Sequence, residues 1–421
     1  MSTVDPNQET ADLVVVGAGA AGLATAIFAK EAGPDLHIVL LEGAKKVGAK
    51  ILISGGGRCN VTHRVVHESD FQGNQPIVRG LLRSFTETDA VEWFASMGVE
   101  LKEEDTGKLF PTTDSARTVL DALLKRCADL GIELLTSHRV QAVRPSETGW
   151  TIEHTEGSHT TRRVAIATGG LALPKSGSDG FGLDLARDLG HEVTPTWPGL
   201  VPLLLEDSFP HARLSGIAHE VELTTWIEGK LADRRAGALL WTHFGISGPV
   251  AMDASRFLVG ANQKGKQAHI TASLLPDHTP ESLRELLNQT SRDEPKRTIG
   301  SLLARSLPKR VVEIVLELSE IDGNPPIAQL PKQTKKSLVT TLTALELPIT
   351  GDRGWSYAEV TAGGVPLAEI DRRTMESRRH RGLHFVGEVL DCEGRIGGFN
   401  FQWAWTTGHQ AGEAIASKLK S

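Results

Sequence analysis

The segment 12–42 constrains the fold of this chain more than any other. An apolar run at 13–16 leads into Gly-Ala-Gly-Ala-Ala-Gly at 17–22, an alanine-rich segment follows, and a second apolar run at 38–41 ends on Glu42. A strand, a glycine turn, a helix and a strand closed by an acid are typical of a dinucleotide-binding unit. We therefore predict an α/β fold of the Rossmann-like kind.

Each glycine of the turn at 17–22 has a physical task. Gly17 permits the tight turn, Gly19 lets the backbone approach a pyrophosphate, and Gly22 allows close packing of helix on strand. The helix N-terminus, which includes Ala20 and Ala21, offers free N–H groups and partial positive charge to an anion. These residues are expected to bind the phosphates of a dinucleotide.

Glu42 follows Gly22 by twenty residues and is placed to accept hydrogen bonds from a ribose diol. Its carboxylate disfavours a 2′-phosphate, so the adenosine half should be of the FAD or NAD kind. A membrane span or signal segment at 13–29 is the alternative. The run is short for a span, acidic and polar residues precede it, and no basic segment comes before it, which favours the dinucleotide unit.

The composition places the chain among multidomain globular proteins. Its 421 residues exceed one ordinary core, and a net charge of −7 gives no global attraction to nucleic acid or to an anionic membrane. The three cysteines, Cys59, Cys127 and Cys392, form no CxxC pair, which indicates a reducing compartment, by default the cytoplasm. No HExxH helix is present, and no metal is expected.

The pattern along the chain predicts three domains. A nucleotide-binding domain is expected at 11–197 and 355–421, because a terminal strand at 383–388 and a helix from about Ala404 to Lys418 return to the first sheet. An inserted β-rich domain is expected at 198–278 and about 346–354. A nested helical domain, rich in lysine and arginine, is expected at 279–345.

A second glycine-rich segment lies at 48–60. Three consecutive glycines, 55–57, weaken helix and strand alike, so they are expected where the main chain presses against a flat ligand or turns sharply. Arg58 could face a phosphate or a ring carbonyl, and Asn60 could hydrogen-bond the edge of a ring. An ordinary surface loop is the alternative. A further glycine-rich loop after the strand at 163–167 gives a weaker indication of nucleotide contact.

Several ordered motifs together resemble the YhiN/BaiN-like family of FAD-dependent oxidoreductases. The matching segments are 14–60, 242–249, 361–365, 374–377 and 387–404. The resemblance implies a two-dinucleotide-binding-domain flavoprotein fold with an inserted β-barrel-like domain and a small helical domain. It also implies bound FAD.

The resemblance carries a set of cofactor-binding residues onto this chain. Gly17, Gly19, Gly22 and Glu42 would hold the ADP half, and the helix beginning near Ala404 would point at flavin N1 and O2, where its dipole stabilises the reduced ring. The remaining candidates are Lys50, Ser54, Gly55, Gly56, Gly57, Arg58 and Asn60 at the flavin; Val140, Thr168, Gly169 and Gly170 at the crossing strands; and Gly387, Glu388, Asp391, Gly397, Gly398, Phe399 and Asn400 on the ribityl and pyrimidine side.

The expected chemistry is hydride transfer through the flavin. No second strand-linked GxGxxG is present, so NADH or NADPH would enter the flavin cleft transiently. Similar family members reduce activated carbon–carbon double bonds, including a uridine of large-subunit ribosomal RNA and enone steroids, and others carry an aminoacetone oxidase label. Cys59 is the first candidate for the proton donor and His243 the second. A packing thiol and a structural histidine remain the alternatives.

A ribosomal RNA substrate would explain the cationic helical segment and the arginines at 372–381, because phosphate binding uses Lys and Arg. The leading hypothesis is therefore a flavin-dependent reductase acting on a small molecule or on ribosomal RNA. An FAD-dependent oxidase of a small amine or metabolite is the second hypothesis, and a flavin-bearing RNA or protein interaction module is the third. Neither a membrane nor DNA is expected as a partner.

Overall fold

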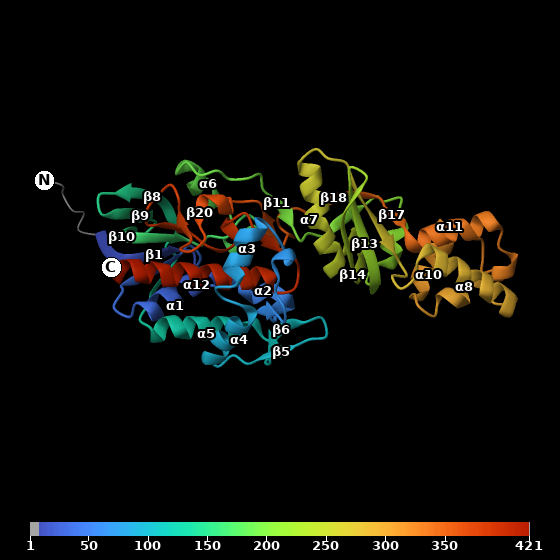
Figure 1. Cartoon of the computed structure of the whole chain (residues 1–421), viewed down its shortest axis with the longest axis horizontal. Helices are drawn as coiled ribbons and strands as arrows, with labels where there is room; N and C mark the ends of the chain where they lie inside the picture. Colours follow the sequence, from blue (N-terminus) through green and yellow to red (C-terminus); the bar gives the residue numbers. More distant parts are fainter. Residues whose placement is uncertain (1–7, 421) are drawn as a thin grey trace. The chain divides into compact units, whose positions relative to one another are not determined.

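The computed structural model describes residues 8–420, which divide into two compact units (Figure 1). Unit 1 comprises the described residues up to Thr196 and those from Val360 onward, and unit 2 comprises Trp197–Glu359. None of the helices in the described range has the length and apolar character needed to span a bilayer.

Unit 1 is built on a nine-stranded sheet with the order β20-β21-β22-β10-β1-β2-β7, to which β8 and β9 add beside β10. The five central strands run parallel, as the α/β prediction requires. The C-terminal strand pairs with β10 in the register Val164↔Leu383, so the two ends of the chain share one sheet. The strands are β1 (Gln8–Val16), β2 (Ile38–Glu42), β7 (Glu133–Thr136), β8 (Val140–Ser146), β9 (Gly149–His154), β10 (Gly157–Ile166), β20 (Ile370–Asp371), β21 (Glu376–Ser377) and β22 (Leu383–Phe385).

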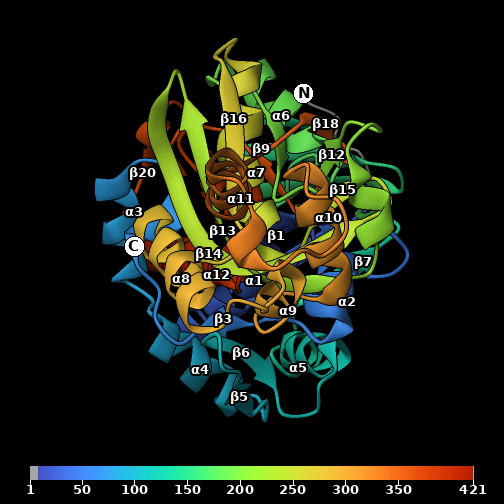
Figure 2. The same cartoon turned by 90° about the vertical axis from the view of Figure 1, so that its right-hand side faces the viewer.

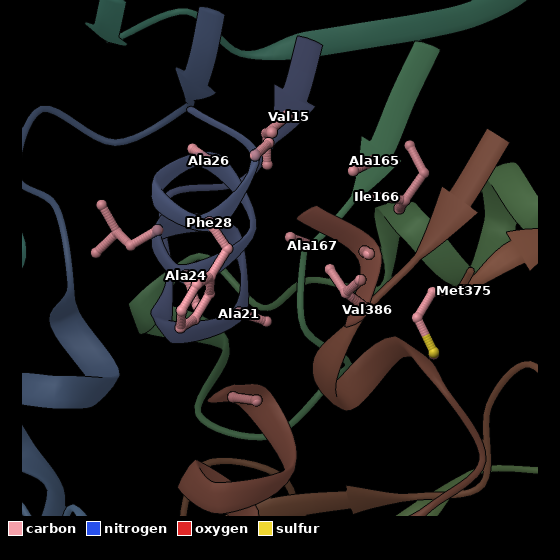
Figure 3. Close-up of a cluster of buried hydrophobic side chains, with 14 of the residues drawn as sticks. Val15, Ala21, Ala24, Ala26, Phe28, Ala165, Ile166, Ala167, Met375 and Val386 are labelled. Atoms are coloured by element: carbon pink, nitrogen blue, oxygen red, sulfur yellow. The ribbon is translucent and has the colours of Figure 1, made fainter. Parts of the chain in front are cut away.

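The apolar core of unit 1 lies between this sheet and its helices. Val15 of β1 and Ile166 of β10 lie in one buried cluster with Ala21 and Phe28 of the first helix (Figure 3). The helices are α1 (Ala20–Ala32), α2 (Ala49–Gly57), α3 (Gln75–Leu82), α4 (Glu87–Ser96), α5 (Ala116–Asp129), α6 (Phe181–Asp188) and α12 (Phe399–Lys420). Small ladders add β3 (Thr62–His63), β5 (Leu101–Glu103) and β6 (Lys108–Pro111), and β4 (Phe71–Gln72) with β23 (Glu393–Gly394); β19 is Val360–Ala362.

Helices α1 and α12 approach each other unusually closely. A Cβ built on Gly408 would lie 2.7 Å from the Cβ of Ala24, and one built on Gly412 would lie 2.7 Å from the backbone nitrogen of Ala29. Small residues at these positions let the two backbones meet, in the way that small-residue interfaces do. The C-terminal helix is thereby fixed against the helix of the first glycine turn.

Unit 2 contains a seven-stranded antiparallel sheet with the order β17-β16-β13-β14-β15-β12-β18. No ladder joins the end strands within the described chain, yet β17 and β18 are separated by Pro348 alone, so the sheet must curl until its ends meet. Its strands are β12 (Leu203–Leu205), β13 (Ala218–Ile227), β14 (Lys230–Thr242), β15 (Gly245–Ser247), β16 (Ala268–Ser273), β17 (Leu345–Leu347) and β18 (Ile349–Asp352); β11 is Trp197–Gly199.

Helix α7 (Pro249–Gln263) packs on this sheet, and Figure 2 shows the long β13–β14 hairpin beside it. Four more helices form a group between β16 and β17 in sequence, at the right of Figure 1. They are α8 (Pro280–Asp293), α9 (Ile299–Leu303), α10 (Lys309–Leu318) and α11 (Lys332–Thr343).

Candidate functional site

The first glycine turn connects β1 to α1. Gly17 has a φ of +102°, and a Cβ there would lie 2.6 Å from the carbonyl oxygen of Ala167. A Cβ on Gly22 would lie 1.9 Å from the carbonyl oxygen of Gly17. Gly19 is the N-cap of α1, makes no side-chain cap, and has no described neighbour within 4 Å of a built Cβ. The helix N-terminus with Ala20 and Ala21 is therefore open to an anion.

Glu42 ends β2 and is fixed by two backbone N–H groups. Its Oε2 accepts from Ala18 at 2.9 Å, and its Oε1 accepts from Ala44 at 2.8 Å. These bonds hold the carboxylate beside the glycine turn with acceptor capacity left for a ribose. The sequence identified Glu42 but not these two backbone donors.

The second glycine segment ends α2. The helix is regular up to Ile53, and then Ser54, Gly55 and Gly56 leave helical geometry. Gly55, Gly56 and Gly57 have φ values of +55°, +69° and +86°, a region that favours glycine. The three glycines are exposed, and no described neighbour lies within 4 Å of a Cβ built on Gly56. The segment thus presents open backbone to solvent.

Lys50 and Glu388 bring α2 and the C-terminal segment together. Lys50 Nζ lies 2.5 Å from Glu388 Oε2, although 338 residues separate them in sequence. Glu388 Oε1 accepts from the N–H of Thr361 at 2.9 Å. The hydroxyl oxygen of Thr361 accepts from the N–H of Leu171 at 2.7 Å, and a Cβ on Gly169 would lie 3.9 Å from Glu388 Oε2. Three separate predicted segments therefore converge here.

Gly387 connects this cluster to both long helices. Its N–H donates to Thr407 Oγ1 at 3.0 Å, and its carbonyl accepts from Trp403 Nε1 at 3.1 Å, both on α12. A Cβ on Gly387 would lie 2.7 Å from the Cβ of Ala21 at the start of α1. Thr407 is a supporting residue that the sequence did not indicate, whereas Trp403 lies within the matching segment 387–404.

Helix α12 begins at Phe399, five residues before the predicted start at Ala404, so that prediction was wrong. It begins directly after Gly397 and Gly398, whose φ values are +130° and +92°. A Cβ on Gly398 would lie 2.8 Å from Asn60 Oδ1. The N-terminus of α12 thus lies beside Asn60 of the second glycine segment.

Two predicted polar residues have unsatisfied buried oxygens. Asn60 Oδ1 and Thr168 Oγ1 are buried and have no hydrogen-bond partner among the described residues. A buried unpaired acceptor costs about 1–3 kcal/mol, so a ligand donor at Asn60 would remove a real penalty. Asn400, in contrast, is already paired, because its side chain bonds both the N–H and the carbonyl of Gly394.

Gly170, Asp391 and Val140 complete the predicted set in unit 1. A Cβ on Gly170 would lie 2.3 Å from Thr361 Oγ1, which ties it to the Glu388 cluster. The N–H of Asp391 donates to the carbonyl of Val365 at 2.8 Å. Val140 begins β8 with a buried side chain, so only its backbone is free to meet a ligand.

Arg58 contacts both the glycine segment and a hairpin later in the chain, because its Nε donates to the carbonyl of Gly55 at 3.4 Å. Its Nη1 lies 2.5 Å from Glu104 Oε1, and its guanidinium carbon lies 4.1 Å from the ring centroid of Phe110. The hydrogen bond to Glu104 raises the pKa of Arg58. The same ring lies close to the glycines, since a Cβ on Gly55 would lie 2.9 Å from Phe110 Cε1. Arg58 therefore helps to hold the Phe110 ring beside the glycine segment.

The two candidate proton donors lie in different units and different environments. Cys59 of unit 1 has no exposed surface, adopts a left-handed φ of +61°, and hydrogen-bonds with Ser54. Burial raises the pKa of this thiol to about 12. His243 of unit 2 is exposed on the turn between β14 and β15, with its ring 5.1 Å from that of Phe244. Only His243 is accessible as arranged here.

The residues of unit 1 fit FAD. They provide an open helix N-terminus for the pyrophosphate, a fixed carboxylate at the ribose position, exposed left-handed glycines for a flat ring, and an unpaired amide oxygen beside a second helix N-terminus. No group of three or more metal-ligating side chains occurs in the described chain.

Known proteins match this chain along its whole length. A family model, the HI0933-like protein Rossmann domain, matches residues 11–414. The ribosomal RNA dihydrouridine synthase of Escherichia coli is 35% identical over 414 residues, covering 97% of this chain and 99% of that protein. The 3-dehydro-bile acid delta(4,6)-reductase of Clostridium scindens is 33% identical over 405 residues, covering 96% and 98%.

Solved structures share the fold at lower identity. The 3-ketosteroid-delta4-(5alpha)-dehydrogenase of Rhodococcus jostii has a TM-score of 0.52 at 16% identity and covers 98% of each chain. The FrdA subunit of Escherichia coli quinol fumarate reductase has a TM-score of 0.52 at 16% identity and covers 99% of this chain and 71% of its own. At this identity the likeness shows a common architecture alone.

Proposed function

The chain belongs to the HI0933-like family of FAD-dependent oxidoreductases, and from this premise we propose that it uses NADH or NADPH to reduce an activated carbon–carbon double bond. We propose a uridine of large-subunit ribosomal RNA as the substrate. Reduction of its C5=C6 bond would give dihydrouridine.

One observation carries this proposal. Two relatives that align over almost the whole chain have different named substrates, a ribosomal uridine and a bile acid, but their names describe the same chemistry. In each, hydrogen is added across a double bond. The ribosomal activity is named for relatives from two organisms, Escherichia coli and Haemophilus influenzae, at 35% and 33% identity. Ribosomal uridine is therefore the first substrate to test.

The candidate site residues of unit 1 would have separate tasks in this reaction. FAD, when bound, would supply the hydride chemistry of this reduction. The N-terminus of α1 would bind the pyrophosphate and Glu42 the ribose. The N-terminus of α12 and Asn60 would border the ring, where the helix dipole favours negative charge on the reduced form. The Lys50–Glu388 ion pair would hold α2 against the C-terminal segment that contains Glu388.

Reduction also requires a proton at the second carbon of the double bond. The nicotinamide is oxidised as it gives up its hydride, and the substrate gains that hydride together with one proton from an acid. We propose His243 as this acid, because it is exposed while Cys59 is buried. Cys59 stays a prediction that requires the second glycine segment to move.

The helical part of unit 2 supports an RNA substrate. Helix α11 carries Lys332, Lys335 and Lys336 at its N-terminal end, and α10 begins with Lys309 and Arg310. In these described helices no acidic residue occupies the first turn. The N-terminus is the positive end of the helix dipole, so cations placed there are not stabilised by it. They make the local potential more positive, which favours an anionic partner.

The arginines at 372–381 give weaker support for RNA binding. Arg379 is engaged with Glu369, and Arg378 donates to the carbonyl of Ile370. These two side chains therefore already have partners within the protein. The lysines of α11 form no ion pair with a residue of the described chain.

Mass spectrometry of digested ribosomal RNA tests the proposal. Deletion of the gene should remove a dihydrouridine from the large-subunit RNA, and wild-type protein should restore it. His243→Ala should fail to restore it while retaining bound FAD. His269→Ala removes another exposed histidine of unit 2 and should restore the modification. An unchanged modification map in the deletion strain would contradict the substrate.

Purified holoenzyme separates the reductase from the other two hypotheses. A reductase should oxidise NADH or NADPH in the presence of the unsaturated substrate. Rapid oxygen consumption with small amines would instead identify an oxidase. A flavin that no donor bleaches would identify a binding module.

A further inference from the structure

Arg353 of unit 2 is held between two aromatic rings. Its guanidinium carbon lies 3.4 Å from the ring centroid of Tyr357 and 4.2 Å from that of Phe244. Two rings therefore lie against the planar group, and its N–H groups are the part that can meet other partners. No carboxylate or other acceptor bonds this side chain among the described residues.

Four other arginines that lie over a ring differ from Arg353. Arg58, Arg139, Arg235 and Arg395 each lie over one ring, and each also pairs with a carboxylate. These pairs neutralise the cation within the protein. Arg353 has two rings and no such pair, so its charge and its hydrogen-bond donors are available to a ligand.

The backbone around Arg353 is fixed. The N–H of Arg353 donates to the carbonyl of Pro202 at 3.1 Å, and the N–H of Tyr357 donates to the carbonyl of Gly354 at 3.0 Å. The nearest acid in sequence, Asp352, accepts from the N–H of Gly354 at 2.7 Å. The guanidinium is therefore positioned before any ligand arrives, which lowers the entropy lost on binding.

The cluster is accessible from solvent. Tyr357 is 48% exposed, Arg353 is half-buried, and His243, whose ring contacts Phe244, is exposed. A planar guanidinium with free edge donors matches the oxygens of a phosphate in bidentate geometry. We infer that Arg353, held by Phe244 and Tyr357, is a phosphate-binding residue of unit 2.

This inference rests on the proposed function for the source of the phosphate. Both reactants proposed above carry phosphate, one in the RNA backbone and the other in the nicotinamide dinucleotide. The two sources present the same chemistry to Arg353, and the experiment must distinguish them.

The test uses FAD-loaded enzyme and four variants. Arg353→Gln removes the charge, and Tyr357→Leu removes one covering ring while keeping the charge. Tyr357→Phe keeps the ring and serves as its control. Arg234→Gln is the matched charge control, because Arg234 is an exposed arginine of the same unit that lies 3.7 Å from Glu222.

The first arm measures binding of a large-subunit ribosomal RNA transcript over a range of salt concentrations. If Arg353 binds an RNA phosphate, Arg353→Gln should weaken binding and reduce the slope of log affinity against log salt by about 0.7–0.9. Tyr357→Leu should weaken binding less, and Tyr357→Phe and Arg234→Gln should behave as wild type.

The second arm measures KM for NADPH and for NADH, with inorganic phosphate as a competing anion. If the phosphate belongs to the nicotinamide, Arg353→Gln should raise KM severalfold and abolish part of the competition by inorganic phosphate, while RNA binding stays unchanged. A rise for NADPH alone would identify its 2′-phosphate.

The inference is overturned if Arg353→Gln matches Arg234→Gln in both arms. Its failure is distinct from failure of the proposed function. Loss of RNA affinity in an enzyme that reduces no uridine would leave the site standing and remove the substrate. Normal uridine reduction by wild-type enzyme, with binding unchanged in Arg353→Gln, would keep the substrate and remove the phosphate site.

Discussion

The first glycine turn, at 17–22, and the second glycine segment, at 55–57, both carry three glycines in unit 1, but their surroundings differ. In the first, glycine is required by crowding, because a Cβ on Gly22 would lie 1.9 Å from a backbone oxygen. In the second, it is required by conformation, because three successive residues have positive φ while Gly56 has open space around it.

This difference separates folding from ligand binding. Close packing at Gly22 joins α1 to the sheet, so the first turn stabilises the fold whether or not a ligand is present. At Gly56 and Gly57 the second segment gains no close packing from glycine, and it bears the entropy cost of all three glycines. Such a segment is explained only by what it contacts when the protein is functioning. Within the first turn, Gly19 resembles Gly56, because the space around a Cβ built on it is open too.

Substitution of Gly22 is expected to have the largest effect. Gly22→Ala places a methyl group against the carbonyl oxygen of Gly17, and the backbone must shift to admit it. Overpacking of this severity should lower the free energy of unfolding by about 3 kcal/mol or more. Urea denaturation of the FAD-free protein measures this loss of unfolding free energy. The loss should appear although no cofactor is bound, because the crowding lies within the protein itself.

Gly19→Ala is the matched control. Its Cβ meets no described neighbour and its backbone conformation is ordinary, so the loss of unfolding free energy should stay below about 1 kcal/mol. The methyl group would occupy the approach of the pyrophosphate, and FAD affinity should fall about tenfold or more. Equal stability losses in the two variants would contradict the distinction between crowding and access.

The first turn could be predicted from sequence because its spacing encodes its geometry. The start of α12 could not, because the run Phe-Asn-Phe-Gln-Trp at 399–403 has weak helix propensity, and burial of Phe399 and Trp403 makes it helical. The contact between Lys50 and Glu388 could not be predicted either, because no local pattern links residues that are 338 positions apart.

The orientation of Arg58 shows the same limit of local reading. Its place after the three glycines predicts a cofactor contact, but it does not reveal the partners Glu104 and Phe110, which come from a hairpin later in the chain. Residue type and spacing therefore predicted the segments of the candidate site, while contacts between residues far apart in sequence determine how individual side chains are oriented.

Gly56→Ala sharpens the comparison with a smaller effect. The left-handed conformation costs alanine about 1–2 kcal/mol, and no crowding adds to this because the space around Gly56 is open. Gly56→Asn should recover part of the stability, because asparagine tolerates this conformation. FAD titration should show weakened binding in both variants, since each adds a side chain to the exposed face. Full affinity in the asparagine variant would contradict a cofactor role for this face.

Cys59 follows the second segment and shares its left-handed backbone, and the effect expected there is on the reactivity of the thiol. Since burial raises the pKa of the thiol to about 12, the folded protein favours the neutral form, and Cys59 should resist iodoacetamide at pH 8. Cys127, buried in α5 with its pKa also raised to about 12, is the matched control.

Mass spectrometry of alkylated peptides distinguishes the two cysteines during turnover. If the second segment opens to let Cys59 donate a proton, its labelling should increase when substrate and NADPH are present, while that of Cys127 stays low. Cys59→Ala should then abolish reduction and Cys127→Ala should preserve it. If Cys59 stays unlabelled and Cys59→Ala remains active, the thiol is a packing residue, and the open glycines serve the cofactor without moving.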